Sequence, residues 1–144
     1  NEAMATMLES QLRAVGVAVD IRKMETAAAT EAATAGEHDL FLWRYDWSDP
    51  DALNMWFASD RIGSTNRAFY NNPELDKLVK QGQVEMDDAA RYPLYIQAQE
   101  ILLNDAVWQP LATPLGKSAV STRVKDLVIA SQGRFLFNDV TVEP

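Results

Sequence analysis

The sequence predicts an α/β fold in which a mixed sheet contains a βαβ unit and is flanked by helices. Helix-like and strand-like stretches alternate over residues 2–45. This order predicts a right-handed crossover between two parallel strands. The second strand-like stretch, residues 39–45, is a short apolar and aromatic run, which is typical of a strand covered on both faces. We therefore expect one lobe that is organised around this strand and the loop after it.

The elements before that loop follow from side-chain spacing. Apolar residues at helical intervals predict an amphipathic helix over 2–15, which Gly16 ends. Residues 17–21 alternate between apolar and polar side chains and predict a strand with one better-buried face. A second helix is expected over 27–35, with Thr26 as its N-cap and Gly36 at its end.

The elements after the loop are expected to be mainly helical. Residues 51–57 predict one or two helical turns, and residues 58–70 predict an irregular loop. Pro73 opens the next helix, in which Gly82 is expected to introduce a bend or break. Its apolar stripe consists of Leu75, Leu78, Val79 and Met86.

A last helix is expected from Asp87 or Asp88 to about residue 105. Its inner face consists of Leu94, Tyr95, Ala98, Ile101 and Leu102. The final third has short β-like runs separated by proline and glycine, which predict two or three short strands.

Composition narrows the function classes. The 144 residues include 13 Lys+Arg and 21 Asp+Glu, and the net charge of -8 argues against nucleic acid and anionic membranes. This charge is mildly compatible with a cationic ligand, but solubility alone is the favoured explanation. The absence of cysteine excludes disulfides, thiolate catalysis and cysteine-ligated zinc. The chain shows neither a signal peptide nor an apolar run of about 18 residues, and we expect it to be a piece of a longer polypeptide.

The loop after residue 45 concentrates carboxylates and indoles. Asp46, Asp49 and Asp51 lie within six positions, and Trp43 and Trp47 stand on either side of Asp46. Open α/β sheets place ligand crevices beyond the carboxyl ends of their strands. A carboxylate shielded by indoles would pair strongly with a ligand ammonium.

Two other interpretations of this loop stay open. A divalent metal loop is one, although the spacing does not match the EF-hand pattern. A structural Asx-turn and helix cap is the other, and it is favoured for Asp49 and Asp51 more than for Asp46.

Other candidate chemistry is weaker. Paired carboxylates could support glycoside hydrolysis, but nothing in the sequence fixes their separation. His38 is the single histidine, and no nucleophile motif accompanies it. Arg44, Arg61 and Arg67 flank the loop in sequence, and one of them could bind a ligand carboxylate. The sequence predicts no metal site and no cofactor.

An ordered series of motifs resembles a known family. The series is QLRAVGV at 11–17, Asp39 to Trp43 followed by Asp46 and Asp49-Pro50, the stretch 66–76, and 91–102 followed by Pro110-Leu111. It resembles the C-terminal half of the family 5 extracellular solute-binding proteins, which are the peptide-, dipeptide- and nickel-type receptors of ABC importers. The resemblance covers essentially all 144 residues.

The resemblance implies a fold and a site. The fold would be a type II periplasmic binding protein, a two-lobed receptor that closes on its ligand. Residues 1–144 would form a single C-terminal lobe, with about 124–144 returning toward the missing lobe. Asp46 matches the acidic residue that pairs with a peptide's amino terminus in peptide-binding members. Trp43 matches a ligand-facing aromatic residue, and Asn66 matches an asparagine that approaches the cleft.

The full set of predicted ligand-binding residues is Asp46, Trp43, Trp47, Asn66 and Arg44. Trp47 enters because it neighbours Asp46. Arg44 enters because it stands where many members have a small residue, so the local pocket is expected to differ. The same loop occurs in members that bind sugars, opines or metal chelates, and the ligand therefore stays open.

The function expected from this resemblance is solute capture for an ABC importer, without catalysis, in the periplasm or another extracytoplasmic space. The partners would be a small solute or peptide, a membrane permease and the missing N-terminal lobe, with no nucleic acid. The exposed sheet edge of a single lobe also predicts self-association. Two alternatives remain, namely a ligand-sensing module of a transcriptional regulator and a hydrolase that uses Asp46 and Asp49.

Overall fold

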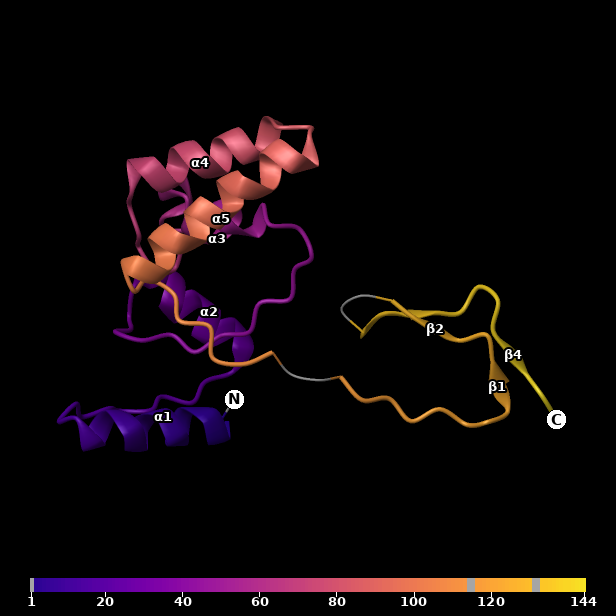
Figure 1. Ribbon diagram of the computed structural model, residues 1–144. Helices are drawn as coiled ribbons and strands as arrows, with labels where there is room; N and C mark the ends of the chain where they lie inside the picture. The colour runs from indigo at the N-terminus through magenta and orange to yellow at the C-terminus, as the bar shows by residue number, and fades with distance from the viewer. Residues whose placement is uncertain (1, 114–115, 131–132) are drawn as a thin grey trace.

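The computed structural model describes residues 2–113, 116–130 and 133–144. The helices of the described residues are α1 (Glu2–Ala14), α2 (Thr26–Ala35), α3 (Ala52–Phe57), α4 (Pro73–Val84) and α5 (Asp88–Asn104), with a 3-10 helix η1 (Ser59–Arg61) after α3. The described strands are β1 (Val124–Lys125), β2 (Val128–Ile129), β3 (Phe135–Leu136) and β4 (Thr141–Val142). The helices gather at one end of the molecule and the strands at the other (Figure 1).

The helices before the loop confirm the predicted positions, with one correction. α1 ends beside Gly16, whose φ of 87° is the left-handed conformation that glycine adopts without strain. α2 ends at Gly36, which is also left-handed, and its main-chain N–H donates to carbonyl oxygens of the last turn. The prediction that Thr26 caps α2 is wrong. Thr26 is already helical, and the N-cap is Glu25, which makes no side-chain capping bond.

The core forms where α4 packs along α5 and α3 packs against both helices. Asn72 caps α4 by accepting hydrogen bonds from the main-chain N–H groups of Glu74 and Leu75, and Pro73 occupies the first turn. Asp87 caps α5. The buried apolar cluster comprises Ala52, Leu53, Trp56, Phe57, Ala58, Leu75, Leu78, Val79, Tyr95, Ala98 and Leu102. The predicted inner faces of both helices are therefore confirmed, except for Met86, which lies beyond α4 and is 91 % exposed.

Gly82 does not interrupt α4, because the helix continues to Val84, and the alternative prediction of a bend stays a prediction. Gly82 is buried where the ring of Tyr95 on α5 crosses α4. A Cβ atom built on Gly82 would lie 2.7 Å from Cζ of that ring. The missing side chain therefore lets the two helices approach at this point.

The predicted mixed sheet and βαβ unit do not form within the described residues. Residues 17–21 and 39–45 belong to no strand. Val17 and Ile21 remain 46 % and 42 % exposed. A strand exists only as a member of a hydrogen-bonded pair, and these two segments pair neither with each other nor with another described segment. The alternation of residues 17–21 and the apolar run of residues 39–45 are strand-like patterns, but neither pattern specifies a pairing partner.

The strands that do form lie in two antiparallel pairs near the C-terminus. β1 pairs with β4 with Val124 opposite Val142, and β2 pairs with β3 with Val128 opposite Leu136. The short β-like runs of the final third are thus confirmed as to type, with four described strands where two or three were expected. The assignment of about 124–144 as a return segment stays a prediction, and residues 131–132 lie outside the described part of the chain.

Candidate ligand-binding loop

The candidate site is the segment 43–51, which leads into α3. Two aromatic side chains fix its first half. The Tyr45 ring lies 3.9 Å from the Trp56 ring, between centroids, and meets Trp108 edge-on at 6.4 Å. Trp47 meets the same Trp56 edge-on at 6.3 Å. Because Trp56 is buried in the core, the loop is attached to the helical body on both sides of Asp46.

Asp46 itself faces solvent. Its side chain is 54 % exposed, and its carboxylate accepts a hydrogen bond of 2.7 Å from the Arg44 guanidinium, which is also largely exposed. An ion pair this open to water contributes little to stability. Asp46 therefore keeps a carboxylate that a ligand could reach, with Arg44 as a competing internal cation.

The two indoles predicted to enclose Asp46 have different partners. Trp43 is half-buried and stacks on Phe41, with 5.0 Å between ring centroids. Trp47 is 58 % exposed and meets Trp56 edge-on. An exposed indole face beside a carboxylate is suited to an apolar or cationic ligand group.

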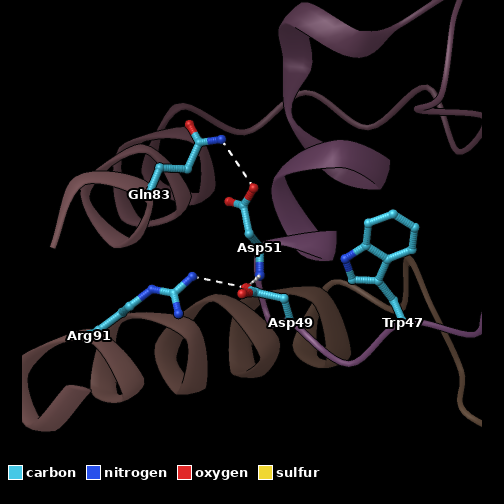
Figure 2. Close-up of a pocket in the computed structure, with 5 residues that line it drawn as sticks. All are labelled: Trp47, Asp49, Asp51, Gln83 and Arg91. Carbon is cyan, nitrogen blue, oxygen red and sulfur yellow. Dashed lines mark hydrogen bonds and ion pairs between the residues drawn. The ribbon is translucent and has the colours of Figure 1, made fainter. Parts of the chain in front are cut away.

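Beside Trp47 the surface is hollowed by a depression of about 360 Å³. Its lining residues are Trp47, Asp49, Asp51, Gln83 and Arg91 (Figure 2). The first three come from the loop and the start of α3, whereas Gln83 comes from α4 and Arg91 from α5. Asp46 is not among the lining residues, so its assignment as the ligand carboxylate stays a prediction.

Asp49 is held by two donors. Its Oδ1 accepts 2.8 Å from the main-chain N–H of Asp51 and 2.9 Å from the Arg91 guanidinium. The main-chain donor first, and Arg91 in addition, hold the pKa of Asp49 below its usual value. The bond to Asp51 forms an Asx-turn, which confirms the turn that the structural interpretation assigned to Asp49. The N-cap of α3 is Asp51, and it makes no side-chain capping bond, so a cap by Asp49 is not observed.

Asp51 is held by neutral donors. Its carboxylate accepts 3.1 Å from the Tyr95 hydroxyl and 3.2 Å from the Gln83 side-chain amide. Burial first, and the charge of Asp51 next, raise the pKa of Tyr95, so the phenol stays protonated and donates at neutral pH. Two successive carboxylates of the loop are thus tied to the α4–α5 hairpin. We call Asp49, Asp51, Gln83, Arg91 and Tyr95 the loop brace.

Asn66 is a buried residue of the segment between α3 and α4. It is 1 % exposed. Its side-chain N–H groups contact the carbonyl oxygens of Phe57, Ala58 and Tyr70 at 3.2, 3.0 and 2.8 Å. Its Oδ1 accepts 3.3 Å from the main-chain N–H of Tyr70. Asn66 therefore shapes residues 57–70, and a direct role toward ligand stays a prediction.

None of the five residues of the loop brace belongs to the predicted set of ligand-binding residues. Asp49 and Asp51 were considered as carboxylates of the loop, whereas Gln83, Arg91 and Tyr95 were not considered for the site. A sequence signal existed for Arg91. It shares the spacing of the buried stripe of α5, because Tyr95, Ala98 and Leu102 follow it at four, seven and eleven positions. A cation on the inner face of a helix requires an anionic or carbonyl partner.

The described residues contain no group of three or more His, Asp or Glu side chains placed to hold a metal ion. Within the same residues, no helix combines the length and apolarity needed to cross a membrane.

Comparison with known proteins gives a consistent result, although no family profile matches the chain. The chain is 32 % identical over 141 residues to the probable D,D-dipeptide-binding periplasmic protein DdpA of Escherichia coli, covering 95 % of this chain and 27 % of that protein. It is 34 % identical over 143 residues to the probable di/tripeptide-binding protein 5 of Pseudomonas aeruginosa, covering 96 % and 27 %.

Solved structures agree with the sequence relatives. HbpA2 of Haemophilus parasuis superposes with a TM-score of 0.79 at 23 % identity, covering 97 % of this chain and 28 % of that one. This superposition shows that the two chains share a fold. The periplasmic binding protein DppA of Helicobacter pylori, in complex with the peptide STSA, superposes with a TM-score of 0.65 at 30 % identity, covering 74 % and 22 %.

The chain is therefore similar in sequence and in fold to one segment of the periplasmic binding proteins. Its homologues are periplasmic proteins of the family 5 solute-binding type, which include peptide- and dipeptide-binding proteins and heme-binding protein A of Haemophilus influenzae, and the chain spans about a quarter of their length. The fold class predicted from the resemblance is thereby confirmed, while the internal βαβ unit is not. The relatives are binding proteins, so they lend no support to a regulator or a hydrolase.

Proposed function

We propose that the chain forms part of the ligand cleft of a solute-binding protein that serves an ABC importer in the periplasm. The solute would be a peptide or another amine-bearing molecule. The relatives support this substrate class, since they include binding proteins for D,D-dipeptides and for di- and tripeptides, and one structural neighbour holds the peptide STSA. The chain would act by capture and release, without catalysis.

One observation carries this proposal in the structure. Asp46 and Trp47 are both more than half exposed, yet the main chain that bears them is fixed by buried aromatic and polar contacts. A charged side chain presented on a supported loop suits a site that a second lobe covers on closure.

Closure explains how an exposed carboxylate could bind strongly. An ion pair in water is weak, whereas removal of water raises the same interaction several-fold. A ligand ammonium at Asp46 would replace the Arg44 guanidinium or share the carboxylate with it. The binding free energy would then shift the protein from an open toward a closed arrangement, which a membrane permease would recognise.

The test uses the full-length receptor that contains this segment. Thermal-shift screening against di- and oligopeptides, sugars and opines would identify the ligand class, and calorimetry would then compare wild type with Asp46→Asn. We expect Asp46→Asn to weaken the binding of an amine-bearing ligand by about thirtyfold or more, because the loss of one partner of a buried charged pair costs about 2 kcal/mol or more. Asp60→Asn is a matched control, because Asp60 is also an exposed partner of basic side chains but belongs to η1. Equal losses in both variants, or no peptide binding by wild type, would contradict the proposal.

The isolated chain offers a second test. Half of the cleft walls would be supplied by the other lobe, so we expect the chain alone to bind the same ligand far more weakly than the receptor. Equal affinities in calorimetry would refute a two-lobed site. Self-association of the chain also stays a prediction, and light scattering that shows a monomer at high concentration would contradict it.

A further inference from the structure

The loop brace joins the candidate ligand loop to a hairpin that lies outside it. From α5, the Arg91 guanidinium reaches Asp49 at 2.9 Å and the Tyr95 hydroxyl reaches Asp51 at 3.1 Å. These bonds span 42 and 44 residues of sequence, so they fix the loop relative to the body and do not form within the loop itself.

The donors are themselves rigidly placed. The Arg91 side chain is 19 % exposed, its Nε donates 3.0 Å to the carbonyl oxygen of Gly82, and its guanidinium carbon lies 5.2 Å from the centroid of the Tyr95 ring. Tyr95 is 1 % exposed and packs against Gly82. Each donor is therefore confined by the α4–α5 contact before it meets a loop carboxylate.

We propose that Arg91 and Tyr95 are positioning residues, which hold Asp46 and Trp47 in the geometry that receives the ligand. This inference rests on the proposed function, because it assigns a role toward the same loop. Asp49 follows Trp47 by two positions and Asp46 by three, so a displaced Asp49 also moves those side chains. A loop ordered in advance leaves less conformational entropy to be lost when ligand binds.

The first experiment follows Trp47 in the chain itself. The protein is labelled with 5-fluorotryptophan, and the ¹⁹F signal of Trp47 is assigned with Trp47→Phe. We expect Arg91→Lys and Tyr95→Phe to shift or broaden that signal. Lysine lacks the planar guanidinium that donates both to the Gly82 carbonyl oxygen and to Asp49, and phenylalanine lacks the hydroxyl that donates to Asp51.

Two matched controls belong to that experiment. Arg61→Lys changes an exposed arginine that pairs with its neighbour Asp60, and Tyr92→Phe changes an exposed tyrosine of the same helix. Both should leave the Trp47 signal unchanged. A Trp47 signal that is identical in Arg91→Lys, Tyr95→Phe and wild type would overturn the proposal.

The second experiment measures ligand affinity in the full-length receptor, at a temperature at which circular dichroism shows every variant folded. We expect the dissociation constant to rise about threefold to tenfold for Arg91→Lys and for Tyr95→Phe, as when loop ordering is left to the ligand. In an Asp46→Asn background the same substitutions should leave the dissociation constant nearly unchanged, because the loop brace acts through that carboxylate. A merely structural role would lower the melting temperature and leave the dissociation constant unchanged, and that result would overturn the proposal.

The two proposals fail in different ways. A wild-type receptor that binds no peptide would refute the proposed function, while the ¹⁹F signal would still decide whether the brace orders the loop. Normal peptide binding by Arg91→Lys and Tyr95→Phe would refute the positioning role and leave the proposed function standing.

Discussion

Gly82→Ala tests the packing on which the loop brace depends. Alanine is about 1 kcal/mol more favourable than glycine inside a helix, so propensity alone predicts a more stable α4. The structure predicts the opposite sign. The new Cβ would lie 2.7 Å from Cζ and 2.8 Å from Cε2 of the Tyr95 ring, well inside ordinary contact.

The ring has little freedom to withdraw. Tyr95 is 1 % exposed, and its hydroxyl is bonded to Asp51 at 3.1 Å. Overpacking of a filled core costs about 1–3 kcal/mol, and a strained hydrogen bond to a carboxylate adds to this cost. After the gain in helix propensity is subtracted, we expect Gly82→Ala to lower the free energy of unfolding by about 1–2 kcal/mol.

Urea unfolding followed by circular dichroism measures this change, and a double-mutant cycle with Tyr95→Leu isolates its cause. With the ring removed, Gly82→Ala should become neutral or stabilising by up to about 1 kcal/mol. Gln81→Ala, at the exposed neighbouring position, should stay within about 0.5 kcal/mol of wild type. Stabilisation by Gly82→Ala in the wild-type background would contradict the expected clash with the Tyr95 ring.

Three further predictions concern single polar groups. Asn66→Leu leaves buried main-chain carbonyl oxygens without a donor and should lower the free energy of unfolding by about 2–4 kcal/mol, whereas the exposed Asn71→Leu should have little effect in the same urea assay. Asn72→Ala removes the cap of α4 and should cost about 1 kcal/mol, and recovery by Asn72→Ser but not by Asn72→Val would confirm the capping role. The folded-state pKa of Asp49 is lowered, so its contribution to stability is present above the unfolded value of 3.8 and is lost as pH falls through the lower folded pKa. The stability difference between wild type and Asp49→Asn should therefore shrink on acidification below pH 3.8, and a difference that is constant from pH 7 to pH 2.5 would contradict it.

The helices could be predicted because their signals are local. Asn72-Pro73 marks the start of α4 and Asp87 marks the start of α5, and the buried stripes of both helices have the spacing that one helical face requires. Gly16 and Gly36 end α1 and α2 in the left-handed conformation that glycine favours.

The strands and the site could be predicted only in part, because both depend on distant partners. Residues 17–21 and 39–45 have strand-like patterns, but no local feature states which segment would pair with them. The carboxylates of the loop were visible in the sequence. Their division into an exposed Asp46 and two braced residues, Asp49 and Asp51, depends on α5, more than 40 positions further along the chain.

The most direct test of the account is a calorimetric comparison of one dipeptide with its N-acetylated form, titrated into the full-length receptor. We expect the free amine to bind at least about tenfold more tightly, because only the ammonium can pair with the carboxylate at position 46. Equal affinities for the two forms would contradict an ammonium-binding role for this loop.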